Sequence, residues 1–213
     1  MRPISAILVL AAAMVVASGV GYKTAEARRP AVLDHTRVRS AAILRQAETF
    51  PDGGVFLIGD SITEFAYVPS LCGRPVLNAG LGGSRVTEWQ GLAPKLFGDA
   101  KPALVIFALG VNDARRSTLA SPDAWERDYA RLVGQAHGAR VAIMGIQPIE
   151  PNKRIGPGFD AERARQLNES ARRVAAATHA VFIAPPTTPQ TSDGIHLNEA
   201  GRREWVQRLN AAC

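Results

Sequence analysis

Two short blocks of this chain carry side chains that could act together in nucleophilic catalysis. The triplet GDS at 59–61 ends an apolar run and presents a hydroxyl, and Asp193 lies three residues before His196. A serine hydroxyl is a weak nucleophile at neutral pH, but an imidazole can take its proton and return it later. A carboxylate on the other ring nitrogen fixes the tautomer and stabilises the imidazolium. Ser61, His196 and Asp193 therefore predict acyl transfer through an acyl-enzyme, without a cofactor or a metal.

Two further blocks offer hydrogen-bond donors for the oxyanion of such a reaction. They read NAGLGGS at 78–84 and GVND at 110–113. A tetrahedral intermediate needs preorganised donors around its negatively charged oxygen. The backbone N–H of Ser61, the backbone N–H of a glycine in the 78–84 block and the side-chain amide of Asn112 could supply them.

All four blocks follow segments that the pattern predicts to be buried strands. Apolar strand-like runs occupy 55–59, 75–78, 103–109, 141–146 and 180–183, and helical patterns occupy 36–49, 86–96, 122–137, 161–178 and 198–210. Continuous apolar runs are typical of strands buried on both faces of a parallel sheet. Strand–helix alternation predicts an α/β sandwich, in which ligands bind outside the carboxyl ends of the strands. The four blocks are thus expected to meet at one edge.

Taken together, the blocks resemble those of the SGNH (GDSL-type) hydrolase superfamily. GDS, NAGLGGS, GVND and the DGIH of 193–196 match its four blocks in order, and the resemblance spans about 55–210. It implies a flavodoxin-like three-layer α/β/α sandwich with a five-stranded parallel sheet, in the order 2-1-3-4-5. The family's spacing in the second block points to Gly83 as the oxyanion glycine. Ile62 stands where the family's name has leucine.

Structural interpretations compete with the catalytic ones. Asp60 and Ser61 could simply cap a helix, and His196 could be a residue of a helix start. Asp113 is expected at a turn or helix start. Arg85 could grip a polar group of the substrate or form an exposed salt bridge.

The first 27 residues have the layout of a secretory signal. Arg2 precedes an apolar run over 4–20, and the segment ends in the small-x-small triplet at 25–27. Cleavage after Ala27 predicts a periplasmic or secreted protein, with a lead-in at 28–52 and a hydrolase domain at 53–213. An uncleaved membrane anchor is the alternative, because the run is at the short end of what spans a bilayer.

The two cysteines and the charge add weaker constraints. Cys72 and Cys213 could pair in an oxidising compartment, or they could be independent thiols. The formal net charge is +6, but the basic residues are scattered along helical patterns. Scattered charge indicates a solvated surface, so no nucleic-acid partner is predicted.

The sequence therefore predicts an exported serine esterase. The insertions between blocks are short and leave little chain for a lipid tunnel or a lid. This favours small-molecule or saccharide esters of short acyl groups such as acetyl, and a membrane partner only if 1–27 is retained. An acyltransferase, a thioesterase or a lysophospholipase with the same triad is an alternative. A non-catalytic surface-binding domain with this fold is a more distant one.

Overall fold

The computed structural model describes residues 34–213, and one compact unit covers Thr36–Cys213. The predicted signal at 1–27 lies outside the described residues. Within 34–213, no helix is both long and apolar enough to cross a membrane. Residues 36–52 of the predicted lead-in belong to the same unit as the strands, because Ile43 and Ala47 of the first described helix are buried in the common core.

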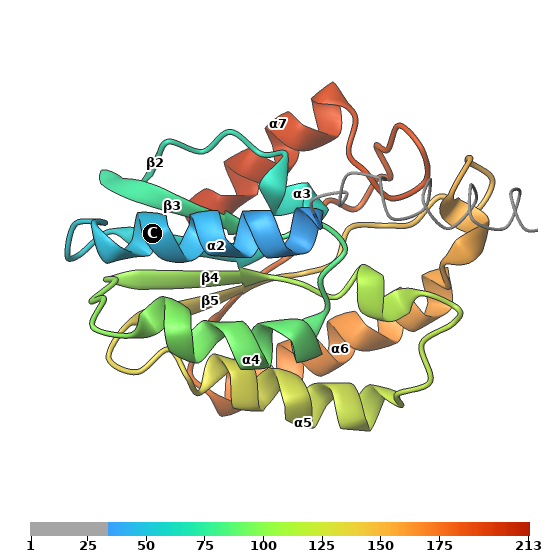
Figure 1. Ribbon diagram of the computed structural model, residues 1–213. Coiled ribbons are helices and arrows are strands. Elements are labelled where there is room, and N and C mark those ends of the chain that lie inside the picture. The colour runs from blue at the N-terminus through green and yellow to red at the C-terminus, as the bar shows by residue number, and fades with distance from the viewer. Residues whose placement is uncertain (1–33) are drawn as a thin grey trace, which may run out of the picture. The chain divides into compact units, whose positions relative to one another are not determined.

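A six-stranded sheet forms the middle layer (Figure 1). In spatial order, its strands are β2 (Ser70–Leu71), β3 (Arg74–Gly80), β1 (Val55–Gly59), β4 (Leu104–Ala108), β5 (Arg140–Met144) and β6 (Val181–Ile183). The last five pair in parallel, in the order expected for the five predicted strands.

The expected strand count is corrected by β2, which pairs antiparallel with β3 at the sheet edge. Cys72 and Gly73 connect the two strands, and both have positive φ, 53° and 70°. Two such residues make the tight turn that suits a hairpin. A two-residue strand has no periodicity that sequence reading could detect.

Helices occupy the intervening segments: α2 (His35–Glu48), α3 (Ser61–Glu64), α4 (Val86–Phe97), α5 (Pro122–Val133), α6 (Ala161–Ala177) and α7 (Glu199–Arg208). Single-turn 3₁₀ segments cover Asn112–Ala114, Gly156–Gly158 and Leu209–Ala212. Side-chain oxygens of Ser121, Asp160 and Asn198 cap α5, α6 and α7 by accepting backbone N–H groups. The predicted helix at 122–137 ends earlier, at Val133, and the short α3 was not predicted.

The helices cover both faces of the sheet. Phe56 of β1 packs on Phe97 of α4, with ring centroids 6.3 Å apart, and edge-on against Phe50, just after α2. Both α2 and α4 therefore lie on that face. In Figure 1, α7 lies on the other side of the strands from α4 and α5. The three-layer α/β/α sandwich is confirmed.

Two glycines let α3 lie directly on the carboxyl end of the sheet. A Cβ on Gly59 would be 1.9 Å from the Thr63 hydroxyl oxygen, and one on Gly80 would be 2.1 Å from the Glu64 backbone nitrogen. Any larger residue at either strand end would displace the helix. The close approach places the first residue of α3, Ser61, at the sheet edge.

The structure joins Cys72 and Cys213 in a disulfide, with Cα atoms 5.3 Å apart. The bond ties the last residue of the chain to the β2–β3 turn. The guanidinium of Arg140 adds a hydrogen bond of 3.0 Å to the carbonyl of Ala212. The disulfide and this hydrogen bond together fix the C-terminal segment to the β2–β3 turn and to the first residue of β5.

Candidate active site

Ser61 lies at the start of α3, where its backbone geometry is set by Asp60. The Asp60 carboxylate accepts a hydrogen bond of 2.9 Å from the Ile62 N–H and so caps the helix. Asp60 is therefore the N-cap residue of α3, in agreement with the structural interpretation of this aspartate. The helix cap does not use the side chain of Ser61, which is 8% exposed. Its hydroxyl is therefore free to face another group.

That other group is His196. The Ser61 Oγ lies 2.9 Å from His196 Nε2, and His196 Nδ1 lies 2.8 Å from Asp193 Oδ2. Burial tends to raise the pKa of Asp193, but hydrogen bonds from the His196 ring and from two backbone N–H groups outweigh it. The pKa of Asp193 is therefore held below its ordinary value. An ionised Asp193 makes Nδ1 the protonated ring nitrogen and leaves Nε2 to accept from Ser61.

A pocket of about 420 Å³ opens beside Ser61. Gly83, Asn112 and His196 line it as well, so the structure brings the residues of all four sequence blocks to one place. Gly83 has φ +77°, and a Cβ there would meet nothing within 4 Å. The glycine is thus required by the backbone conformation, which L side chains rarely adopt.

Two connected loops hold Asp193 and His196 in place, and sequence reading missed their contacts. Glu150 accepts a hydrogen bond of 3.0 Å from the Thr191 N–H and pairs with Lys153 at 2.8 Å. The hydrogen bonds to Lys153 and Thr191 lower the pKa of Glu150 to about 2. Backbone bonds from Glu150 N–H to Gly194 and from Ile155 N–H to Asp193 complete the connection. No spacing signal in the sequence links residues 150 and 191.

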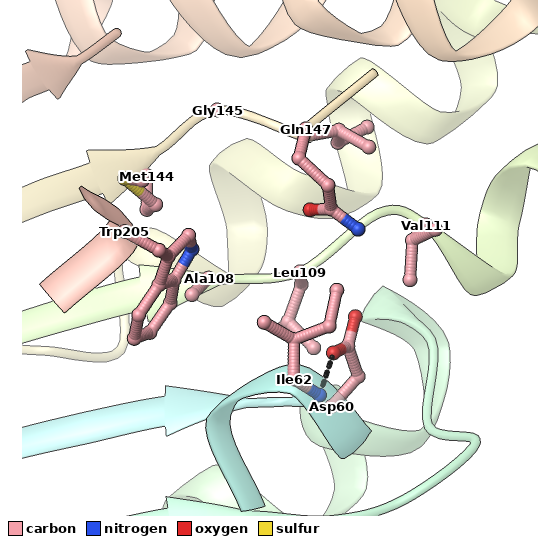
Figure 2. Close-up of a pocket in the computed structure, with 10 residues that line it drawn as sticks. Asp60, Ile62, Ala108, Leu109, Val111, Met144, Gly145, Gln147 and Trp205 are labelled. Atoms are coloured by element: carbon pink, nitrogen blue, oxygen red, sulfur yellow. Dashed lines mark hydrogen bonds between the residues drawn. The ribbon is translucent and has the colours of Figure 1, made fainter. Parts of the chain in front are cut away.

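A small cavity of about 10 Å³ is lined by Asp60, the residue before Ser61 (Figure 2). The carboxyl of Asp60 and the amide of Gln147 point toward one another there, and the Trp205 indole forms one wall. Gln147 also donates a hydrogen bond of 3.0 Å to the Ile195 carbonyl. Burial raises the pKa of Asp60 to about 7, assisted by repulsion from Asp113, against the hydrogen bond from Ile62. Burial likewise raises the pKa of Asp113 to about 7.

Two other residues considered in the sequence analysis lie outside the lining of the pocket beside Ser61. Arg85 pairs with Glu88 at 2.6 Å and is not among the residues that line the pocket beside Ser61, so its geometry is that of the salt-bridge alternative. Asp113 lies in a 3₁₀ turn, as expected, but it is buried. Within 34–213, no group of three or more His, Cys, Asp or Glu side chains could hold a metal ion.

An α/β/α sandwich with a Ser–His–Asp array at the carboxyl edge of its sheet is the framework of a class of serine hydrolases. A model of the GDSL-like lipase/acylhydrolase family matches residues 57–204. The chain therefore belongs to this family, which confirms the resemblance of the four blocks. Its enzyme class is accordingly that of a serine hydrolase acting on ester bonds.

The chain is also similar to individual proteins. It is 33% identical to Esterase TesA of Pseudomonas aeruginosa over 141 residues, 63% of this chain and 67% of that protein. It superimposes on a lipase/acylhydrolase from Enterococcus faecalis with a TM-score of 0.64 and 19% identity, covering 74% and 93% of the two chains. A carbohydrate acetylesterase from Sinorhizobium meliloti gives a TM-score of 0.60 and 20% identity, covering 74% and 96%. These two structural likenesses show a shared fold.

Proposed function

We propose that the protein is an exported esterase that releases short acyl groups, acetyl in particular, through Ser61. The observation that carries the proposal is the hydrogen-bonded row from Ser61 Oγ through His196 to Asp193, at 2.9 and 2.8 Å. Ser61 attacks the ester carbonyl, and His196 takes its proton and passes it to the leaving alkoxide. Water then attacks the acyl-enzyme, with His196 again as the base.

We assign the oxyanion hole to three donors, each from a residue that lines this pocket. They are the backbone N–H groups of Ser61 and Gly83 and the side-chain amide of Asn112. Asn112 Nδ2 donates one hydrogen to the Ser84 carbonyl at 3.1 Å, which leaves its second hydrogen for the oxyanion. Preorganised donors of this kind stabilise the negative charge that develops on the carbonyl oxygen in the transition state.

Two pockets that His196 lines support the proposed substrate class. On the Ser61 side, the charged guanidinium of Arg115 lines the pocket, and a charged wall does not favour a long alkyl chain. On the other side, a smaller pocket of about 220 Å³ is lined by Phe65, Ser192 and Arg202. Phe65 is 65% exposed, and an exposed ring beside polar groups suits the apolar face and hydroxyls of a sugar. The likeness in fold to a carbohydrate acetylesterase supports a saccharide ester.

Export is proposed from two features. The segment at 1–27 has the layout of a secretory signal. The disulfide between Cys72 and Cys213 belongs to an oxidising compartment such as the periplasm or the exterior. Extracts fractionated after expression of the full chain would give activity outside the cytoplasm, and N-terminal sequencing would begin at Arg28.

The proposal is tested with p-nitrophenyl acetate, butyrate and octanoate as substrates for the chain without residues 1–27. We expect turnover to fall with acyl length and Ser61→Ala to abolish it. Ser117→Ala, which removes an exposed hydroxyl, is the control and keeps full activity. Rising activity toward octanoate would overturn the short-acyl assignment. Turnover that requires an added sugar acceptor would make the protein an acyltransferase, and Ser61-independent turnover would contradict the triad.

A further inference from the structure

Arg115 lies in the same pocket as the proposed oxyanion hole and contacts one of its members. Its guanidinium donates to Asn112 Oδ1 twice, from Nε at 3.3 Å and from Nη2 at 3.1 Å. It also lines the pocket together with Ser61 and His196. None of the four sequence blocks includes this arginine as a functional residue.

The contact decides which way the Asn112 amide faces. A guanidinium has only donors, so it can bind the oxygen of the amide and not its nitrogen. Nδ2 must then face the other way, where it donates to the Ser84 carbonyl at 3.1 Å. A flipped amide would oppose an N–H to Arg115 and an oxygen to the Ser84 carbonyl. Arg115 and Ser84 together therefore fix Asn112 as a donor.

Arg115 is itself held by the loop on the other side of the pocket. Its guanidinium lies 4.8 Å from the centre of the Phe159 ring, a cation–π contact. The backbones of Arg115 and Phe159 form an antiparallel bridge, flanked by a bond of 2.8 Å from the Asp160 N–H to the Ala114 carbonyl. A side chain anchored in this way can hold its partner in one orientation.

We propose that Arg115 is a positioning residue for the oxyanion hole, holding the Asn112 amide with Nδ2 toward the reacting carbonyl oxygen. This rests on the proposed function. The positive charge next to Oδ1 also polarises the amide and makes its N–H a stronger donor. The effect of Arg115 on the reaction is then exerted through Asn112 and is greatest in the transition state, where the oxyanion exists.

A double-mutant cycle tests the proposal with p-nitrophenyl acetate. We expect Arg115→Ala to lower kcat by roughly 10- to 100-fold at nearly constant KM, as expected for a displaced catalytic donor. Asn112→Ala should lower kcat by about 10²- to 10³-fold. Because Arg115 acts through Asn112, the double variant should be no slower than Asn112→Ala alone. Arg115→Lys should restore part of the rate, since lysine keeps a charged donor but loses the planar fork.

Arg116→Ala is the matched control. Arg116 is the next residue, and it is also an exposed arginine, but it donates to the Pro157 carbonyl and pairs with Asp160 at 3.6 Å. It should keep the wild-type kcat and KM. Melting temperatures of all variants identify any that fail to fold, and Arg115→Gln, which keeps a long polar side chain, replaces Arg115→Ala in that event.

Each other outcome overturns the proposal. An unchanged kcat in Arg115→Ala means that Asn112 needs no support. Losses that multiply in the double variant, or a rise in KM alone, mean that Arg115 binds substrate directly. Full activity in Ser61→Ala would instead refute the proposed function. If Ser61→Ala and Asn112→Ala lose activity while Arg115→Ala keeps the wild-type kcat, only the positioning function of Arg115 is refuted.

Discussion

Asp193 binds His196 twice within a single turn of the chain. One carboxylate oxygen accepts from the imidazole Nδ1 at 2.8 Å, and the other accepts from the His196 backbone N–H at 2.9 Å. One side chain therefore sets both the path of the backbone and the orientation of the ring. The spacing of three residues between Asp193 and His196 is what allows this double contact.

Removing the charge at Asp193 should damage the reaction far more than the fold. Asp193→Asn keeps the size of the side chain but no longer imposes the required tautomer on His196, and we expect kcat to fall about 10⁴-fold. Steady-state kinetics with p-nitrophenyl acetate and a melting curve measure the two effects. A loss of less than tenfold in kcat would contradict the orienting function of Asp193.

Gly194 should tolerate no side chain. Its φ is +118°, and a Cβ would lie 2.6 Å from the backbone nitrogen of Gly156. Gly194→Ala must push the loop of Asp193 away from the 147–158 loop, so we expect activity to be lost and stability to fall by about 1–3 kcal/mol. Gly138→Ala is the control, since that glycine also has positive φ but faces open space. It should lose stability without losing kcat.

Glu150 should make acid stability depend on its contacts with Thr191 and Lys153. Its pKa is lowered to about 2, so its ionised form stabilises the fold above its ordinary value of 4.5. That contribution is lost as pH falls from 4.5 through about 2. Melting temperatures between pH 2 and 6 should therefore fall less steeply on acidification in Glu150→Gln.

The same variant should also lower kcat, because Glu150 connects the 147–158 loop to the segment before Asp193. Glu162→Gln, which breaks an exposed pair with Arg165 in α6, should leave kcat unchanged. Equal kinetics in the two variants would show that the Asp193 loop needs no such support.

Asp60 and Asp113 should have the opposite pH dependence. Burial raises the pKa of each to about 7, from 3.8. At a pH between the unfolded pKa of 3.8 and the folded pKa of about 7, each carboxyl is protonated in the folded protein and ionised in the unfolded chain. The free energy of unfolding therefore falls as pH rises from about 4 to about 7, and then levels off. The limiting slope is about 1.4 kcal/mol per pH unit for each carboxyl. Denaturant unfolding at several pH values should give a shallower slope for Asp113→Asn, and an unchanged slope would refute the assignment.

Reduction of the disulfide should destabilise the whole unit. Cys72 and Cys213 are 141 residues apart, so the bond restricts the unfolded chain strongly, and we expect its loss to cost roughly 2–5 kcal/mol. Chemical denaturation with and without dithiothreitol measures the difference. The Cys72→Ser/Cys213→Ser variant should match the reduced protein and respond to dithiothreitol no further. A response in that variant would assign the effect to something other than this bond.

Much of the fold could be predicted because its signals are local. The apolar runs marked five parallel strands, and caps such as Ser121 marked helix starts. The edge strand β2 and the one-turn α3 were missed, since neither is long enough to have a period. Their existence depends on a turn with positive φ and on the close approach that Gly59 and Gly80 permit.

The sequence by itself determined the family and the enzyme class, because the blocks that contain Ser61, Asp193 and His196 combine residue types that have few other joint uses. Only the tertiary structure decided which residues from elsewhere in the chain lie close to these blocks. Arg115 reaches Asn112, Glu150 reaches Thr191 and Asp60 comes near Asp113. Such contacts depend on how loops far apart in the chain fold over the same sheet edge. That arrangement follows from burial and packing of the whole core, which no local pattern records.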